Sequence, residues 1–218
     1  MTEGERRLEL KNFAMTLFKN EPNHCQVLVD IYAKATGLVR SITPIIPVEM
    51  GSMGQSRPTI YRWARGSNVA AALIEDLTAV LIGSSLRTGE GRGKGPHFAG
   101  NISGSDGFKS SLQDRWNQIQ HATAGVVIGY RYGKPGEWFA RFLEDETQDD
   151  LLYVAACPVG MWLSGNPEDY MKLPEKIRQA IGDNTCLKPQ PILQWSPAML
   201  KNPPPTPSLW ERETKRPR

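Results

Sequence analysis

Three features are scarce in this chain of 218 residues, and each absence excludes a class of protein. There are only three cysteines, Cys25, Cys157 and Cys186, and no two of them are close in sequence. This spacing argues against a disulfide framework and against a Cys-x-x-Cys metal site. We therefore expect reduced, mostly buried thiols, and we predict neither a metal ion nor another cofactor.

Long apolar runs are also missing. The longest, from Leu151 to Leu163, is too short to span a bilayer and is interrupted by Pro158. The charged stretch from Met1 to Lys11 has no apolar segment of the kind found in signal peptides. We therefore expect a soluble protein that is made in the cytoplasm and has no membrane span. Export by a signal-independent route stays open.

The excess of positive charge is small. The chain has 26 basic and 23 acidic residues, which gives a formal net charge of +3. This balance requires neither nucleic acid nor an anionic membrane as a partner. Apolar residues make up 39% of the chain, which is enough for a sizeable core because the polar Gly- and Pro-rich stretches account for much of the remainder.

Hydrophobic periodicity predicts helices in the first half of the chain, and the evidence for strands is weak. Apolar residues recur at intervals of three and four over residues 4–19, 24–39 and 68–86. Asn23 stands directly before the second of these segments and is expected to cap it.

Further helices are expected in the second half. One should run from about residue 110 to 130 and end at Gly133, and a short one should cover residues 138–143. Two more are expected, one over residues 149–162 that is either kinked or interrupted near Pro158 and one with Pro174 in its first turn. The predicted fold is mainly α, a single helical domain of about six to eight helices over residues 1–188.

Proline dominates the end of the chain. Eight of the 17 prolines lie in residues 189–218, which predicts an extended, polyproline-like C-terminal arm. The arm also carries Trp195, Leu209 and Trp210. Apolar anchors on an extended segment are suited to docking on a protein partner or on a neighbouring subunit of a homo-oligomer.

Seven glycines in residues 89–107 predict a Gly-rich loop. The stretch from Gly89 to Gly95 does not meet the requirements of a phosphate-binding loop. Its spacing is one residue short, and no Ser or Thr follows Lys94. We interpret it as a plain loop, and an anion-binding loop that uses Arg92 and Lys94 stays open.

The strongest functional pattern is a polar stripe within residues 110–130. Asp114, Asn117, Gln118 and His121 are spaced at i, i+3, i+4 and i+7, which is one face of a helix. After His121 the sequence is apolar or small on all sides, so the helix should enter the core there. A relay from Asp114 through the two amides would orient the His121 imidazole as a general base.

Two alternatives for this stripe stay open. In the first, its side chains have a structural role and tie down the Gly-rich loop. In the second, His97 from that loop joins the site as a further catalytic residue. If His97 and His121 also met Asp106 or Asp114, a two-His-one-carboxylate metal site would become possible, but this needs several contacts that a sequence does not show.

Two smaller patterns concern packing. Cys157 lies in an apolar run, so we expect an inert, buried thiol rather than a nucleophile. Gly125 and Gly129 have the spacing that lets another helix approach closely, and the segment around Ala155 and Ala156 is the expected partner.

The sequence supports two functional hypotheses. The first is a non-catalytic interaction or structural subunit that docks through its C-terminal arm. The alternative is a small hydrolase or toxin-like effector with its site at the 89–107 loop and the helix face from Asp114 to His121, so whether the protein is an enzyme stays open.

Overall fold

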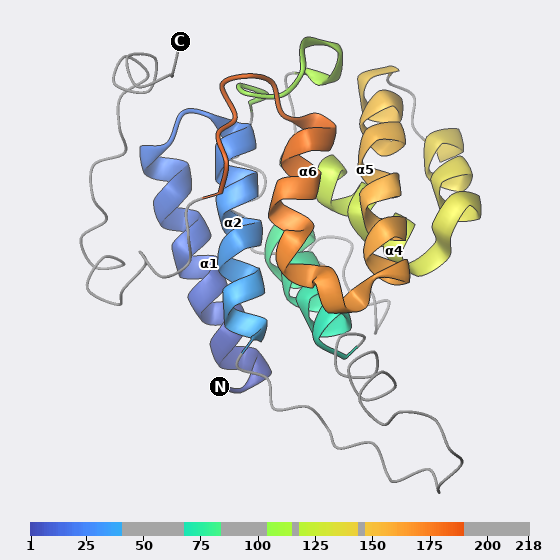
Figure 1. Ribbon diagram of the computed structural model, residues 1–218. Helices are drawn as coiled ribbons and strands as arrows, with labels where there is room; N and C mark the ends of the chain where they lie inside the picture. The colour runs from blue at the N-terminus through green and yellow to red at the C-terminus, as the bar shows by residue number, and fades with distance from the viewer. Residues whose placement is uncertain (41–67, 84–103, 115–117, 144–146, 190–218) are drawn as a thin grey trace, which may run out of the picture.

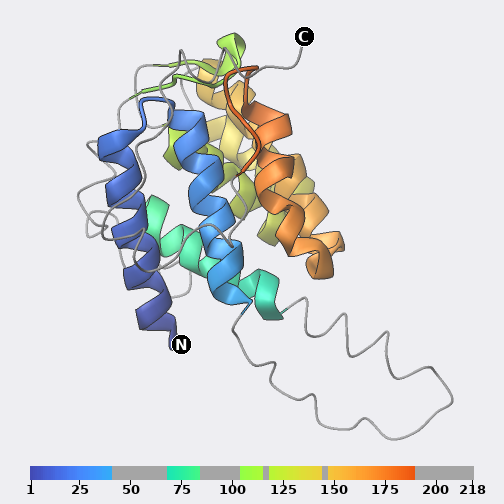
Figure 2. The same cartoon turned by 60° about the vertical axis from the view of Figure 1, so that its left-hand side comes forward.

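The computed structural model describes residues 1–40, 68–83, 104–114, 118–143 and 147–189 (Figures 1 and 2). Within these ranges the protein is mainly α-helical and has no β-strand, only an isolated antiparallel bridge between Phe108 and Gly182. The prediction of a mainly α fold is confirmed. Most of the predicted Gly-rich loop and nearly all of the C-terminal arm lie outside the described residues.

The helical elements follow one another along the chain, and residues 68–77 form a further helix that continues into the π-helical segment η1. They are α1 (Glu3–Asn20), α2 (His24–Val39), η1 (Thr78–Ile82), η3 (Ser110–Leu112), α4 (Gln118–Leu143), α5 (Thr147–Gly165), η4 (Pro167–Lys172) and α6 (Leu173–Ile181).

The first two helices begin at side-chain caps. Thr2 and Glu5 form a reciprocal capping box, in which Glu5 Oε2 accepts from the Thr2 backbone N–H at 2.7 Å. The Asn23 side chain accepts from the backbone N–H of Gln26 at 2.8 Å, which confirms the predicted cap of α2. Figures 1 and 2 show α1 and α2 side by side.

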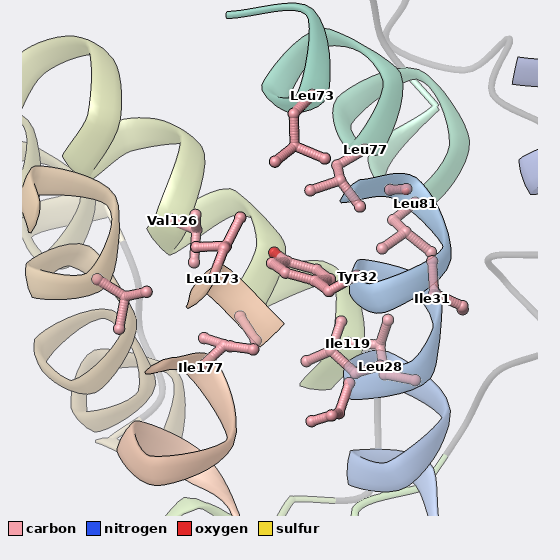
Figure 3. Packing of buried hydrophobic residues seen from close by; sticks show 14 of the residues in the cluster. Leu28, Ile31, Tyr32, Leu73, Leu77, Leu81, Ile119, Val126, Leu173 and Ile177 are labelled. Atoms are coloured by element: carbon pink, nitrogen blue, oxygen red, sulfur yellow. The ribbon is translucent and has the colours of Figure 1, made fainter. Parts of the chain in front are cut away.

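Helix α2 is the centre of the molecule. Fourteen of its 16 residues are buried, because α1, α6, α4 and η4 all pack against it. Tyr32 of α2 lies among leucines, isoleucines and valines of four other segments (Figure 3). Because α2 is buried on every side, its sequence is apolar along nearly its whole length rather than on one face only.

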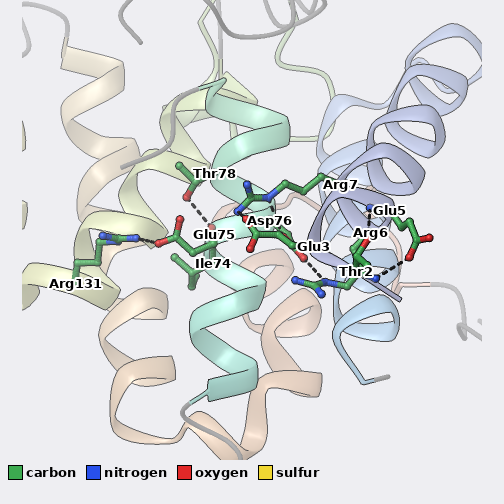
Figure 4. A network of polar contacts seen from close by, with 10 residues as sticks. All are labelled: Thr2, Glu3, Glu5, Arg6, Arg7, Ile74, Glu75, Asp76, Thr78 and Arg131. Carbon is green, nitrogen blue, oxygen red and sulfur yellow. Dashed lines mark hydrogen bonds and ion pairs between the residues drawn. The ribbon is translucent and has the colours of Figure 1, made fainter. Parts of the chain in front are cut away.

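A buried ion pair connects α1 to the helix of residues 68–77 (Figure 4). Asp76 Oδ2 lies 2.7 Å from Arg6 Nε, and its other oxygen lies 3.1 Å from Arg7 Nε. The Asp76 side chain is only 3% exposed, so its charge depends on these two partners. On the same helix, Glu75 accepts a hydrogen bond from Arg131 of α4.

Helix α4 is divided by a sharp reversal at Gly133, where φ is 61° and ψ is −145°. Glycine adopts this conformation without the steric cost that other residues have. The predicted break at this position is confirmed, but the second helical arm begins at residue 134 and not at 138. Pro135 fits there because the first turn of a helix needs no backbone N–H donor.

The predicted continuous helix over residues 110–130 is wrong in its first part. The chain forms only a 3₁₀ turn at η3, Gln113 is extended with φ −81° and ψ 125°, and α4 begins at Gln118. Side-chain amides replace the helical hydrogen bonds: Gln113 Nε2 donates to Phe108 O at 2.9 Å, and Gln118 Nε2 donates to Leu112 O at 2.8 Å.

The last helices agree with the sequence pattern. Helix α5 continues through Pro158 as one helix, so the predicted interruption at this proline does not occur. Pro174 stands in the first turn of α6 as predicted. Among the helices of the described residues, none combines the length and the apolar character that crossing a bilayer requires.

Candidate functional site

The first arm of α4 and helix α5 run in the same direction and pack unusually closely. A Cβ atom at Gly125 would lie 2.8 Å from Ala156 Cβ, and one at Gly129 would overlap the backbone carbonyl of Cys157. A Cβ at Gly160 of α5 would overlap the backbone of α4 in turn. The predicted close approach to the segment around Ala156 is therefore confirmed, and the two backbones are in contact.

His121 lies at the start of this contact and faces a carboxylate from the other helix. Its Nδ1 atom is 3.3 Å from Asp149 Oδ2. The imidazole is 22% exposed, whereas the Asp149 side chain is 8% exposed. Asp149 belongs to the first turn of α5, where the helix dipole favours a negative charge. The pair therefore combines a buried carboxylate with an imidazole that solvent still reaches.

Tyr153 forms another side of the His121 environment. The two rings meet edge to face, with centroids 6.1 Å apart and planes inclined by 62°. The Tyr153 ring also lies beside Gly125, since a Cβ there would be 3.4 Å from its Cδ1 atom. Two groups of the neighbouring helix, Asp149 and Tyr153, therefore contribute to the position of the imidazole.

This arrangement determines which ring nitrogen is available for chemistry. A neutral imidazole carries one N–H, and a carboxylate opposite Nδ1 favours the tautomer with the hydrogen on that atom. In that tautomer the Nδ1 hydrogen lies on the side of the ring that faces Asp149 Oδ2, and Nε2 of His121 keeps a lone pair that accepts a proton.

Cys157 lies two helical turns along α5 from Asp149, on the same face. Eight residues at 1.5 Å rise place them roughly 12 Å apart along the helix axis, so the thiol is not next to His121. Burial, together with the smaller effect of the Glu137 charge, raises the pKa of Cys157 to about 12. The prediction of a buried thiol is confirmed, and the raised pKa agrees with the expectation that this thiol is not a nucleophile.

Glu137 is a buried carboxylate on the second arm of α4, and both of its oxygens lie 2.8 Å from Lys134 Nζ. Both residues belong to the same helical arm, and the Lys134 ammonium group compensates the negative charge of the Glu137 carboxylate. We therefore assign no separate chemistry to it.

The structure does not place Asp114 on the helix that carries His121. Asp114 is half-buried and precedes α4, because the chain is extended at Gln113. The spacing on which the predicted Asp114–His121 relay depended is therefore absent. Gln118 does lie on α4, but its buried side chain binds the Leu112 carbonyl.

Several predicted site residues lie outside the described residues. These are His97, Asn117, Trp195, Leu209 and Trp210. Asp106 is described, and its backbone carbonyl accepts a hydrogen bond from the backbone N–H of Cys25 at 3.0 Å, so this part of the loop lies beside the start of α2. In the part of the chain that the structure describes, no group of three or more His, Cys, Asp or Glu side chains is arranged to hold a metal ion.

The partner that sequence reasoning missed is Asp149. The sequence placed it at the start of a helix, and the helix dipole was a sufficient explanation there. A signal did exist. The chain reversal at Gly133 makes α5 parallel to the first arm of α4, and extending the Gly125–Ala156 contact back by one to two turns brings His121 to the start of α5.

No protein-family profile matches this chain, and comparison with curated proteins and with solved structures finds no significant similarity. The functional argument therefore rests on the geometry of the described residues.

Proposed function

We propose that this protein is a small hydrolase in which His121 is the general base and Asp149 orients it. The observation that carries the proposal is the 3.3 Å separation between His121 Nδ1 and Asp149 Oδ2 across two helices. An imidazole with a buried carboxylate at Nδ1 is a common arrangement for proton transfer in catalysis.

The proposed step needs only these two residues and water. His121 Nε2 takes a proton from a water molecule as that water attacks the substrate, and Asp149 stabilises the imidazolium that forms. The proton then passes from Nε2 to the leaving group, which restores the neutral imidazole. Asp149 stays ionised throughout and acts as a positioning residue.

The packing around the pair favours this function over a loose surface contact. Catalytic groups need side chains that are fixed by rigid elements and by neighbouring groups. Here the two helices are in backbone contact at Gly129 and Gly160, and Tyr153 restricts the imidazole from the side. The His121 side chain is 22% exposed, so water reaches the imidazole.

The test is a hydrolysis screen of the full-length protein with chromogenic esters, phosphodiesters, glycosides and peptides. We expect His121→Ala to lower kcat on the responding substrate by about 10³-fold or more, and Asp149→Asn, which favours the wrong tautomer, by a similar factor. Thermal unfolding of both variants, measured in parallel, should show a cooperative transition, which demonstrates that each variant is folded.

His24→Gln is the matched control, because His24 is half-buried in α2 and does not belong to the pair. It should retain the activity. Unchanged hydrolysis in His121→Ala would overturn the proposal, and so would the absence of hydrolysis with every substrate class.

A second candidate function is that of a structural or interaction subunit. Its support among the described residues is a pair of exposed aromatic side chains on either side of the α4 reversal, Tyr132 at 60% and Trp138 at 69% exposure. Aromatic residues of this kind are enriched in the energetically important parts of interfaces. We propose that this end of the molecule, together with the arm of residues 189–218, binds a second copy of the chain.

The mass of the protein in solution tests this second candidate. Light scattering should show an oligomer for the full chain and a folded monomer after deletion of residues 189–218. Trp138→Ser should weaken the assembly, whereas Leu8→Ser, at an apolar position on α1 that is 60% exposed, should not. A full chain that stays monomeric at high concentration contradicts this function and leaves the hydrolase proposal unaffected.

A further inference from the structure

Three segments that are distant in sequence meet beside the start of α2. The backbone N–H of Cys25 donates to Asp106 O at 3.0 Å. From the segment after α6, the N–H of Asp183 donates to Gly107 O at 2.8 Å. These bonds hold the start of α2, the loop before η3 and the segment after α6 together.

The contacts also fix which residues of the first and last segments face each other. Asn23 Nδ2 donates to Thr185 Oγ1 at 3.0 Å, and the backbone N–H of Leu187 donates to Gln26 Oε1 at 2.7 Å. The first contact comes directly before Cys186 and the second directly after it. At the start of α2, the cap residue Asn23 and the helix residue Gln26 lie on either side of Cys25.

Cys25 and Cys186 are therefore opposite each other, and both are fully buried thiols. A hydrogen bond with the Cys186 side chain, together with burial, raises the pKa of Cys25. The sulfur atoms are thus neighbours in the reduced protein. The third cysteine, Cys157, lies elsewhere, between α4 and α5.

We propose that Cys25 and Cys186 are a modification site at which oxidation forms an intramolecular disulfide. A small-molecule disulfide such as oxidised glutathione is the oxidant. One protein thiolate attacks it and releases one glutathione thiol, and the second protein thiol displaces the other. Two protein S–H bonds and one glutathione S–S bond are lost, and one protein S–S bond and two glutathione S–H bonds form.

The proposed disulfide would connect the start of α2 to the segment after α6, just before the point at which residues 190–218 begin. The closed loop includes most of the chain, and stabilisation by a disulfide increases with loop length. We expect the Tm of the oxidised protein to rise by roughly 5–15 °C. Because the pKa of Cys25 is raised, little thiolate is present at neutral pH, and formation should be slow and faster in alkaline buffer.

The test uses the full-length Cys157→Ser variant, incubated with oxidised or with reduced glutathione. Intact mass should fall by two hydrogen atoms only in the oxidising buffer, and peptide mapping without reductant should find residues 25 and 186 in one linked peptide. Cys25→Ser and Cys186→Ser, each in the same background, should lose both the linkage and the rise in Tm.

Three results would overturn the proposal. One is that the folded protein keeps two free thiols after prolonged oxidation in alkaline buffer. Another is that it gains only glutathione adducts or links between molecules. The third is that the linked protein has a lower Tm than the reduced protein, which would show that the native geometry does not accept the bond.

Discussion

Two helix contacts in this protein are built on opposite principles. The contact between α4 and α5 depends on missing side chains, since a Cβ at Gly129 or Gly160 would overlap the backbone of the other helix. The contact between α1 and the helix of residues 68–77 depends on charge, since the buried Asp76 is held between Arg6 and Arg7.

The difference explains how each contact responds to change. Where backbones touch, no neighbouring side chain is available to move aside, and any added atom displaces a whole helix. Where a buried charge is paired, removal of one partner leaves the other without compensation in a poorly solvated position. The first contact is therefore sensitive to added volume and the second to lost charge.

We expect the largest effect from Asp76→Ala. This change leaves Arg6 buried without its partner, and removing one member of a buried ion pair costs about 3–5 kcal/mol. Urea unfolding of the variant and of Asp150→Ala, which removes an exposed carboxylate, measures the difference. Equal free energies of unfolding in the two variants would contradict the idea that the Asp76 contact depends on charge.

Gly129→Ala should have the next largest effect. One added methyl group meets the Cys157 carbonyl, and overpacking of this kind costs about 1–3 kcal/mol in spite of the better helix propensity of alanine. Gly165→Ala is the matched control, because a Cβ there has no atom within 4 Å, and it should be neutral or slightly stabilising. If both variants unfold at the same temperature, the two helices are not in backbone contact.

The smallest effect is expected at the surface ion pair of Arg141 and Asp150. Arg141 Nε lies 2.8 Å from Asp150 Oδ1. The guanidinium hydrogen bond lowers the pKa of Asp150. The small stabilisation is therefore present above the ordinary aspartate pKa and is lost as the pH falls through the lowered value. In measurements over pH 2–7, the Tm of Arg141→Ala should differ little from that of the unchanged protein. A large difference in Tm at pH 7 would contradict the expectation that this ion pair contributes little to stability.

The same comparison bears on the proposed hydrolase. His121 and Asp149 come from the two helices that touch at Gly129, so their separation depends on that contact. A folded Gly129→Ala protein should therefore have a lower kcat, whereas a folded Gly165→Ala protein should not.

Much of the fold could be predicted from local patterns. The periodicity of residues 24–39, the cap at Asn23, the break at Gly133 and the proline at the start of α6 were all recognised from neighbouring residues. The predicted helix was wrong for residues 110–114, which form a 3₁₀ turn and then an extended segment. There the amide side chains of Gln113 and Gln118 bind carbonyls that a helix would otherwise have used.

The candidate site was predicted only in part, for a related reason. His121 stood out because it marks the point at which a polar helix face becomes apolar, which is local information. Its carboxylate partner Asp149 is far from it in sequence, and the closer Asp114 was chosen because helical spacing seemed to connect the two. The chain reversal at Gly133 determines the actual pairing.

The sequence by itself determined the helical class, the main caps and breaks and the inert character of Cys157, because these depend on side chains within one or two helical turns. Only the tertiary structure decided that His121 faces Asp149, that Arg6 and Arg7 share Asp76 and that Cys25 faces Cys186. Each of these pairs joins residues distant in sequence, and their approach depends on how whole helices pack.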